Sequence, residues 1–489
     1  MPDQSYRTFL ANLQQQGEMI HFTKEVDPLA NMSAVEWKTY NDLGKSSLFT
    51  NIKGHDGWQA CSQILADRGK WSIGLGIPED EMLETMSLRL REPIPTEDVD
   101  PDNAPVREVI LKGEDANLND IPAMLTSEKD GGRFLASGMA IIKDPETGIR
   151  NMSIHRQQIM GRDKTGFLML HRQARRIYDM YCERNEPTPV AMVFGVHPAI
   201  FFGSAYTTRF GVDELELSGG LLGEAVRMVK CETIDVEVPA EAELVIEGEV
   251  LPNHLEPEGP FGEVPGTYAM QGHSEIFKVK AITRRKDPIF YAIHCGFPVT
   301  DTQQTTALGI EIATREHLRN VEGGLDLRDI RCVTAAGLMM LVLKIRPRVE
   351  GQAKTALMAA LSGPYLHPKV AIAVDEDIDA ADLRQVMWSM TTGARGEGCR
   401  ADPEHAGVPA RQHLAHRRGD GQPAPVGHQM DGRRHHAGAD AGRRARPLRT
   451  RDPEELRQRE PGRLPSVTKA RQAATPGGRI SASFSTCSR

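Results

Sequence analysis

Apolar and polar residues alternate with a period of two along three segments in the middle of the chain: 234–238, 242–250 and 275–283. A polar turn (Arg284 to Pro288) follows the last of these and leads into a fourth, more apolar run, 289–293. Period-two runs separated by turn residues are typical of paired strands. This pattern predicts an antiparallel sheet or barrel in the middle of the chain.

Helical spacing dominates the beginning of the chain. Phe9, Leu10 and Leu13 are placed for one face of an amphipathic helix, and residues 34–43 form a second helical pattern that ends before Gly44, a suitable C-cap. The stretch 91–105 is rich in proline and acidic residues and is expected to be a linker.

From residue 305 the pattern changes to alternating helices and strands. A helix is expected around Leu308 to Val321, and the later elements are a strand-like segment (330–333), an apolar core element (335–345), a helix (352–361), a strand (370–374) and a helix (386–392). Such alternation indicates an α/β domain.

These patterns predict a mixed α/β and β fold divided at residues 1–115, 116–305 and 306–392. The remaining residues, 393–489, have a different composition, with many Arg, Gly, Ala and Pro residues, a single Lys (Lys469) and no Tyr or Trp. A natural disordered tail is one interpretation. We favour a second, a GC-rich gene read in a shifted frame, because the change interrupts a helix in progress. The third domain would then be truncated.

The overall composition bounds the class of protein. The 489 residues carry a formal net charge of −8, which provides no electrostatic footprint for nucleic acid. No run approaches the ~20 apolar residues of a membrane helix, and no signal-peptide pattern opens the chain. The seven cysteines are scattered without a C-x-x-C pair, so a cytoplasmic protein with reduced thiols is expected.

Three clusters carry candidate chemistry. The stretch 150–156 follows a turn-like segment, and a hairpin there would bring Asn151, a neutral oxygen ligand, close to Arg156, whose guanidinium suits a carboxylate or phosphate. The stretch 258–263 places Glu258 and Glu263 around two glycines and a proline, as a tight loop that presents both acids. Carboxylates held close together tend to keep one of them protonated, which suits a general acid.

The third cluster is acidic. Alternation is expected to put Glu214 and Glu216 on the same side, where one of them would ligate Mg²⁺ or Mn²⁺ together with Asn151 and a histidine. His171 stands beside apolar residues, and a structural role for it remains open. Each cluster taken alone is also compatible with ordinary surface charge.

Taken together, the clusters resemble the UbiD-like decarboxylases. The resemblance runs from about Ile121 to Asp379 and depends on five stretches in order: DGGRF (130–134), KDPETGIRNMSIHR (143–156), KCETIDVEVPAEAELVIEGE (230–249), EGPFGE (258–263) and HPKVAIAVDEDID (367–379). It implies an N-terminal α/β domain, a middle split β-barrel that binds prenylated FMN, and a C-terminal α/β domain that supports oligomers.

The resemblance also implies roles for individual residues. Arg156, Glu258 and Glu263 match the family's catalytic network, with Glu263 as the acid that protonates carbon after CO₂ leaves. The metal ligands, usually for Mn²⁺ with Mg²⁺ as the alternative, would be Asn151, His171 and Glu214, and K⁺ is a further candidate ion. The cofactor would contact these three residues, Arg156, the phosphate-binding Lys369, and the strand residues Met152, Ser153, Ile154 and His155.

The implied activity is non-oxidative, reversible decarboxylation of an aromatic or other unsaturated carboxylic acid. The implied partners are a flavin prenyltransferase that supplies the cofactor and further copies of the chain, in a dimer or hexamer. Two alternatives stay open: a silent flavin-binding subunit or damaged gene product, and a metal-dependent hydrolase that uses Glu258 and Glu263 as an acid/base pair.

Overall fold

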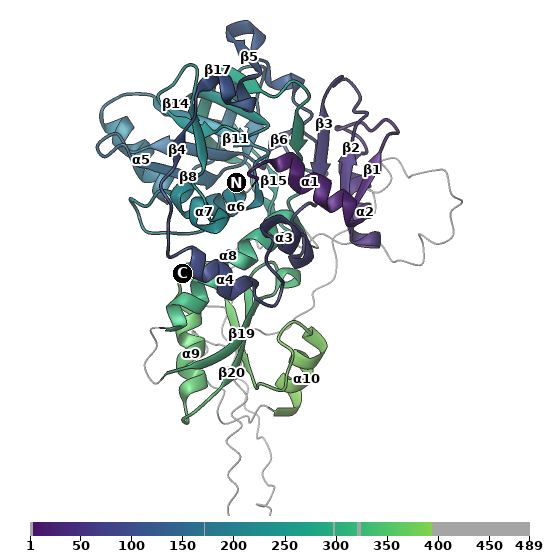
Figure 1. The fold of residues 1–489 in the computed structure, drawn as a ribbon, viewed down its shortest axis with the longest axis vertical. Helices are drawn as coiled ribbons and strands as arrows, with labels where there is room; N and C mark the ends of the chain where they lie inside the picture. The colour runs from purple at the N-terminus through teal and green to yellow at the C-terminus, as the bar shows by residue number, and fades with distance from the viewer. Residues whose placement is uncertain (1–2, 171, 297–298, 320–323, 394–489) are drawn as a thin grey trace, which may run out of the picture.

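The structure is a computed structural model that describes residues 3–170, 172–296, 299–319 and 324–393. Figure 1 shows the larger sheets and their helices in the upper part of the molecule and a smaller α/β unit below them, with α4 and α8 between the two. The shifted-frame interpretation of residues 393–489 concerns a segment that lies, from residue 394 on, outside the described residues.

The first sheet has four strands in the order β1-β2-β3-β18. The sheet strands and the N-terminal helices are, in chain order, α1 (Tyr6–Gln15), β1 (Met19–Phe22), α2 (Met32–Leu43), β2 (Ser46–Phe49), β3 (Gln59–Ser62), α3 (Arg68–Leu75), α4 (Met82–Arg89) and β18 (Ile289–Tyr291). The last strand comes from far along the chain and pairs in parallel with β3.

The two expected helices of this region are confirmed. Ser5 caps α1 by accepting a hydrogen bond from the backbone N–H of Arg7, and the face with Phe9, Leu10 and Leu13 is buried. Gly44 ends α2 in the left-handed conformation, which glycine adopts at little cost.

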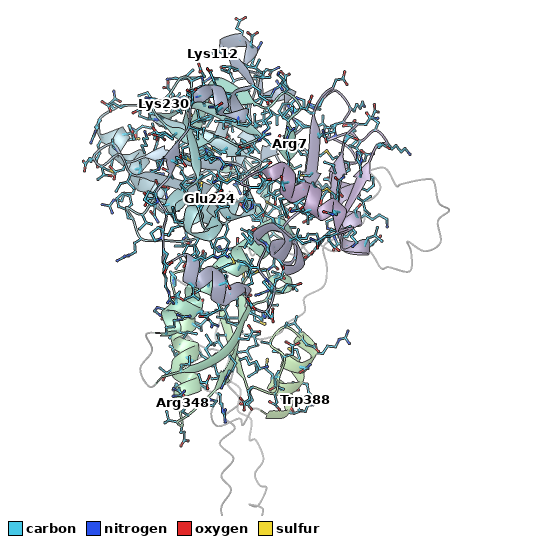
Figure 2. All side chains as sticks on the ribbon, in the orientation of Figure 1. Arg7, Lys112, Glu224, Lys230, Arg348 and Trp388 are labelled. Carbon is cyan, nitrogen blue, oxygen red and sulfur yellow. The ribbon has the colours of Figure 1, made fainter. Side chains whose placement is uncertain are left out.

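Helix α1 is also fixed to the middle of the chain by charge. Arg7 (labelled in Figure 2) donates hydrogen bonds to both carboxylate oxygens of Glu243, at 2.7 and 2.8 Å. The side chain of Glu243 is completely buried, so this two-point contact joins the N-terminal helix firmly to the start of β14.

The second sheet confirms the expected antiparallel sheet and is the largest, with nine strands in the order β6-β9-β10-β17-β14-β11-β7-β8 and β5 paired to β17. Its members are β5 (Val109–Lys112), β6 (Phe134–Leu135), β7 (Met139–Lys143), β8 (Arg150–Ile154), β9 (Gln157–Ile159), β10 (Lys164–Phe167), β11 (Thr188–Phe194), β14 (Leu244–Glu258) and β17 (Gly272–Arg284). The pairings within it are antiparallel.

Both faces of this sheet are covered. Along β11, Ala191 and Val193 belong to one apolar cluster, while Val190, Met192 and Phe194 belong to another. Successive side chains point to opposite faces of a strand, which explains why β11 is apolar throughout instead of alternating.

Smaller elements surround the large sheet. They are α5 (Gln173–Glu183), α6 (Pro198–Ala205), α7 (Glu214–Leu222), a three-stranded sheet of β13 (Glu237–Pro239), β12 (Arg227–Lys230) and β4 (Glu97–Asp98), and the hairpin β15 (Phe261–Gly262) with β16 (Tyr268–Ala269). Short 3-10 turns lie at Pro101–Asn103, Pro105–Arg107, Gly113–Asp115 and Leu118–Asp120.

The third part is the lower α/β unit. It contains α8 (Asp301–Arg319), β19 (Asp326–Cys332), a 3-10 turn (Thr334–Ala336), β20 (Met340–Arg346), α9 (Gln352–Leu361), β21 (Val370–Val374) and α10 (Leu383–Gly393), with strand order β19-β20-β21. The expected helix 352–361 and strand 370–374 are confirmed at these bounds, and the apolar core element 335–345 overlaps β20 from residue 340 on.

Four expectations about the N-terminal and middle regions need correction. The strand expected from residue 234 begins only at Glu237. The segment 289–293 forms β18 of the first sheet instead of joining the middle one, and the large sheet includes β5, from before residue 116. The expected linker also contains β4, which pairs with β12. Strand pairing therefore crosses the boundary expected at 115/116.

Within the described residues, no helix combines the length and apolar character that a membrane crossing requires.

Candidate functional site

The hairpin of β7 and β8 delivers the first cluster, as expected. Asp144 organises its turn, because the carboxylate accepts hydrogen bonds from the backbone N–H groups of Glu146 (2.8 Å) and Thr147 (3.1 Å). In the paired strands Asn151 lies opposite Ile142 and is buried. Arg156 lies in the two-residue connection between β8 and β9.

Arg156 joins the two acids of the second cluster. Its Nε and Nη2 atoms donate to the two oxygens of Glu258, at 3.1 and 2.9 Å, and its Nη1 donates to Oε1 of Glu263. The guanidinium also lies over the ring of Phe261, 5.0 Å from its centre, which is a favourable cation–π position. The expected grouping of Arg156, Glu258 and Glu263 is therefore present.

The two carboxylates differ in exposure. The side chain of Glu258 is 2% exposed, while that of Glu263 is 33% exposed. Both oxygens of Glu258 are occupied by the fork of Arg156. Glu263 is held by Arg156 at one oxygen, and its side chain is open to incoming molecules.

The loop between Glu258 and Glu263 is supported by residues that the motif analysis did not single out. Gln158 donates from Nε2 to the carbonyl of Gly131 (2.9 Å) and accepts at Oε1 from the N–H of Gly259 (2.8 Å). Asp130 accepts from the N–H of Gly262 at 2.8 Å. Gln158 follows Arg156 by two residues, and Asp130 is the first residue of the DGGRF stretch. Their closeness to the motifs was the sequence feature that could have identified them as site residues.

The third cluster is built around Glu214, which is buried at the start of α7. Its carboxylate accepts hydrogen bonds from Nδ2 of Asn151 (3.1 Å), the backbone N–H of Met152 (2.8 Å) and Oγ1 of Thr208 (3.2 Å). Burial raises the pKa of Glu214 to about 7 despite the contacts that lower it. Asn151 and Glu214 are thus together, as expected, and Thr208 is an addition.

The expected pairing of Glu214 with Glu216 on one side is wrong. The segment is helical, and residues two apart on a helix point in different directions. Asp213 begins α7 as its N-cap by accepting from the N–H of Leu215 at 2.9 Å. Glu216 is accordingly half-buried and has no place in the ligand group.

A second chain of polar contacts runs along the expected cofactor strand. The ring of His155 contacts the carbonyl of Leu168 through Nδ1 (3.0 Å) and Oγ of Ser153 through Nε2 (3.0 Å), and it stacks on Phe167. Burial lowers the pKa of His155, although the contact with Leu168 opposes the shift. A neutral ring with a proton on Nδ1 satisfies both bonds.

The donor set suits a divalent metal. A buried carboxylate whose pKa is raised to about 7 gains from a cation. The neighbouring Asn151, whose amide nitrogen faces Glu214 here, also carries an amide oxygen, which is a second hard ligand. No group of three His, Cys, Asp or Glu side chains suited to a metal occurs within the described part of the chain. The third expected ligand, His171, lies outside the described residues.

Lys369 lies just before β21, half-buried, where its backbone N–H bonds to the carbonyl of Met339 at 2.8 Å. Among the described residues none forms an ion pair with its ammonium group. That group is suited to a phosphate, but the structure does not bring it into contact with Asn151 or Glu214.

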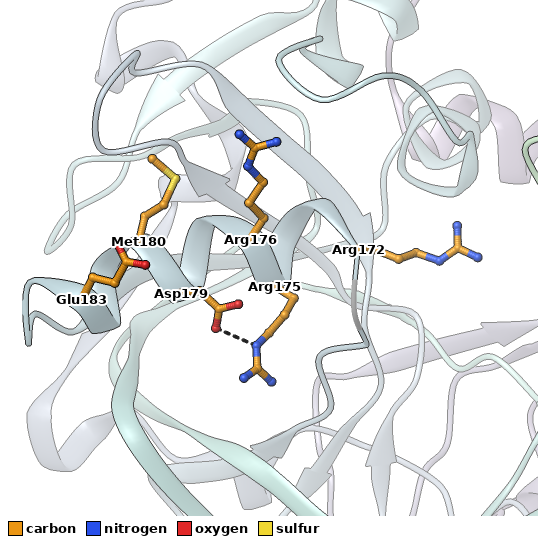
Figure 3. Close-up of a pocket in the computed structure, with 6 residues that line it drawn as sticks. All are labelled: Arg172, Arg175, Arg176, Asp179, Met180 and Glu183. Carbon is orange, nitrogen blue, oxygen red and sulfur yellow. Dashed lines mark hydrogen bonds and ion pairs between the residues drawn. The ribbon is translucent and has the colours of Figure 1, made fainter.

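One hollow is lined mostly by charged side chains of the α5 region. It has a volume of about 370 Å³, and its lining residues are Arg172, Arg175, Arg176, Asp179, Met180 and Glu183. Figure 3 shows that these arginines point in different directions, and Arg175 is paired with Asp179. The second hollow is small and includes Asn151 in its wall.

Comparison with known protein families accounts for most of the chain. Residues 97–298 match the UbiD family as the 3-octaprenyl-4-hydroxybenzoate carboxy-lyase Rift-related domain. Residues 10–90 match the N-terminal domain of the same carboxy-lyase, and residues 305–398 match its C-terminal domain.

Individual relatives agree. A phenolic acid decarboxylase of Bacillus subtilis is 29% identical over 408 residues, which are 80% of this chain and 85% of the relative. The UbiD-class enzyme HmfF from Pelotomaculum thermopropionicum, solved in an evolved dimeric form with prFMN, is 32% identical with a TM-score of 0.76, over 81% of this chain and 91% of the other. The Klebsiella pneumoniae 3,4-dihydroxybenzoic acid decarboxylase AroY is 27% identical with a TM-score of 0.75, over 81% and 86%.

The three matched domains, in their order along the chain, and the group formed by Arg156, Glu258 and Glu263 lead to one conclusion. This chain belongs to the UbiD family of carboxy-lyases.

Proposed function

We propose that this chain decarboxylates an aromatic or other unsaturated carboxylic acid, reversibly, with prenylated FMN and a divalent metal. Membership in a carboxy-lyase family argues against the alternative of a metal-dependent hydrolase. HmfF, 32% identical, was solved with prFMN, and the Bacillus subtilis relative is a phenolic acid decarboxylase. Both support the proposed cofactor and substrate class.

The observation that carries the proposal is the unequal exposure of the two acids bound to Arg156. Glu263, 33% exposed, is the acid that protonates the substrate carbon, while Glu258, 2% exposed, fixes the guanidinium. A general acid has to come within hydrogen-bond reach of the atom that it protonates, which favours the exposed member of the pair.

Loss of CO₂ from an sp² carbon leaves an electron pair that side chains stabilise poorly, and prenylated FMN supplies the electron sink when bound. Arg156 orients the substrate carboxylate and holds Glu263 in place. The C–CO₂ bond breaks, CO₂ departs, and the proton of Glu263 passes to the carbon that carried the carboxylate. In the carboxylation direction Glu263 takes that proton back.

We assign the metal to Asn151, Glu214 and His171, with Mn²⁺ preferred over Mg²⁺, and we propose K⁺ as a further ion. Lys369 would contact the cofactor phosphate, and residues 152–155 would line the cofactor. The middle sheet would form the split barrel implied by the resemblance. We further propose a cytoplasmic homo-oligomer that receives its cofactor from a flavin prenyltransferase.

The test is to co-express the chain with a flavin prenyltransferase, purify it, and measure the mass of the extracted cofactor and the release of CO₂ from a panel of aromatic acids. Prenylated FMN with CO₂ release from at least one acid is expected. A folded protein that binds prenylated FMN but decarboxylates none of the acids would support the silent subunit instead. Folded protein without flavin would overturn the proposed cofactor.

A further inference from the structure

The segment that carries Glu263 is a tight turn between β15 and β16. We call residues 263–267 the acid loop. Within it, the N–H of Glu263 donates to the carbonyl of Thr267 (2.8 Å), and the N–H of Gly266 donates to the carbonyl of Glu263 (2.9 Å). These bonds fix the loop's internal shape, but they do not fix its position relative to Arg156.

Helix α8 contacts the acid loop through one buried side chain. Nε2 of Gln303 donates to the carbonyl of Val264 at 2.7 Å, and the Gln303 side chain is inaccessible to solvent. Its Oε1 finds no hydrogen-bond partner among the described residues. Burying a polar atom without a hydrogen bond costs free energy. The bond to Val264 is therefore the contact of this amide that offsets part of the cost of burying it.

The start of α8 is itself held firmly. The carboxylate of Asp301 accepts from the backbone N–H groups of Gln63 (2.8 Å) and Leu65 (2.5 Å). Gln303 therefore projects from a helix end that is anchored to the first sheet. A side chain on such an element positions its partner more closely than one on a free loop.

A turn of the C-terminal α/β unit contacts the other part of the acid loop. Gly337 follows the 3-10 turn Thr334–Ala336 with φ at +63°. A Cβ atom at this glycine would lie 3.1 Å from Cα of Pro265 and 3.5 Å from its carbonyl oxygen. The two backbones are thus in direct contact, and only a residue without a side chain fits without displacement.

We propose that Gln303 and Gly337 are positioning residues that hold the acid loop, and with it the Glu263 carboxyl, in register with Arg156. Gln303 fixes the loop by a hydrogen bond from α8. Gly337 fixes it by close packing from the C-terminal unit. The expected effect on catalysis rests on the proposed function. The effect of the two residues on the mobility of the acid loop can be measured whether or not the chain is a decarboxylase.

The decisive comparison uses two glycines of the same unit. Gly351 also has a positive φ, +82°, but a Cβ there would meet nothing within 4 Å. Gly337→Ala and Gly351→Ala share the cost of an alanine at positive φ, and only Gly337→Ala presses on Pro265. Hydrogen–deuterium exchange of peptides spanning 261–268 is the readout.

We expect exchange in these peptides to accelerate about tenfold in Gly337→Ala and to match the wild type in Gly351→Ala. In active holoenzyme, kcat should fall about tenfold or more in Gly337→Ala with KM nearly unchanged, because misplacing the acid slows proton delivery more than substrate binding. Equal exchange in the two variants would overturn the role of Gly337.

A second pair tests the hydrogen bond. Gln303→Met keeps the size of the side chain and removes the hydrogen-bond donor. Gln304→Met is the control: it makes the same change at the next residue, whose side chain forms no hydrogen bond to the acid loop within the described part of the chain. Faster exchange of 261–268 and a larger solvent deuterium isotope effect on kcat are expected only for Gln303→Met. If Gln303→Met changes neither quantity, its role is refuted.

The two proposals fail separately. Absence of CO₂ release from the wild type would overturn the proposed function and leave the exchange comparison intact. Normal CO₂ release from wild type and all four variants, with unchanged exchange, would overturn the positioning role alone.

Discussion

Arg156 binds two carboxylates whose side chains are exposed to different degrees, 2% for Glu258 and 33% for Glu263. This difference in exposure distinguishes two glutamates that have equivalent positions in the sequence motif. Spacing alone predicted that the loop presents both acids, and the resemblance assigned Glu263 as the proton donor. The geometry supports that choice through the one free side of the Glu263 carboxyl.

We predict that Glu263→Gln lowers kcat by about 10² to 10⁴-fold while bound flavin stays at the wild-type level. The amide keeps a hydrogen-bond contact with Arg156 and has no acidic proton to deliver. CO₂ release and cofactor absorbance measure the two effects. Glu256→Gln is the control. Glu256 lies on β14 and forms an ion pair with Lys164 of β10 rather than with Arg156, so its substitution should leave turnover unchanged. Undiminished turnover in Glu263→Gln would remove it as the acid.

A second prediction at this scale concerns a buried ion pair. Burial acts to lower the pKa of His294, but the Glu36 carboxylate, 2.7 Å from its Nδ1, together with the charges of Asp130 and Asp301, raises it above its ordinary value. A raised pKa in the folded state stabilises the protein fully below the unfolded value of about 6.5 and loses this effect as the pH rises through the folded value.

The difference in unfolding free energy between wild type and His294→Gln should therefore be largest near pH 6 and shrink toward pH 9. Urea denaturation at several pH values measures it. Burial raises the pKa of Asp301 to about 7 in the wild type, and a parallel pH series on Asp301→Asn identifies the part of the pH dependence that belongs to this carboxyl. A difference that grows with pH would contradict the assignment.

At the scale of elements, the segment 130–134 supports the loop 258–263. The N–H of Gly131 donates to the carbonyl of Pro260 at 2.8 Å, and a Cβ at Gly131 would overlap the carbonyl of Gly259. The rings of Phe134 and Phe261 pack with centres 4.5 Å apart. Two motifs more than a hundred residues apart are thus one structural unit.

We predict that Gly131→Ala lowers the free energy of unfolding by about 1–3 kcal/mol, because the backbone of one segment must shift to admit the methyl group. Gly272→Ala is the matched control, since a Cβ at Gly272 meets nothing within 4 Å, and its effect should stay within about 0.5 kcal/mol. Denaturant titration of both variants provides the comparison, and equal effects would contradict the predicted clash.

Element type was predictable where the apolar pattern was long and local. The helix 352–361 and the strand 370–374 were predicted at their observed bounds. The segment at Glu214 was misjudged because two charges two residues apart fit a strand and a first helical turn equally well. The N-cap at Asp213 favours the helix. The partner of 289–293 was missed because strand pairing depends on tertiary contacts that no local pattern records.

At the scale of the whole molecule, one buried carboxylate joins the N-terminal part of the chain to the C-terminal α/β unit. Glu311 on α8 is paired with Arg68 of α3 and accepts from the N–H of Cys332, at the end of β19, at 2.7 Å. Burial raises the pKa of Glu311 although Arg68 opposes the shift. Such a contact between distant segments is invisible in the sequence, and it was not predicted.

We predict that Arg68→Met destabilises the protein by about 3 kcal/mol near neutral pH, because it removes the arginine that is paired with a buried carboxylate. Without Arg68 the pKa of Glu311 rises further, so the loss of stability should shrink as the pH falls and the carboxyl takes up a proton. Unfolding at pH 8 and pH 5.5 checks both statements. The double variant Arg68→Met/Glu311→Leu should recover most of the stability, and a failure to do so would contradict an ionic cause.

The domain boundaries and the shifted-frame interpretation of the last segment stay predictions. Sequencing the gene around codon 393 checks the latter directly: an intact frame would refute it.

The position of β18 in the first sheet has a consequence for biosynthesis. Its residues Ile289–Tyr291 pair with Gln59–Cys61, some 230 positions earlier in the chain. The ribosome must therefore deliver nearly three fifths of the polypeptide before the first sheet has its final edge. Closing so long a loop carries an entropic cost that short-range pairing avoids. Until then β3 presents an open edge, a hazard for the nascent chain that chaperones typically cover.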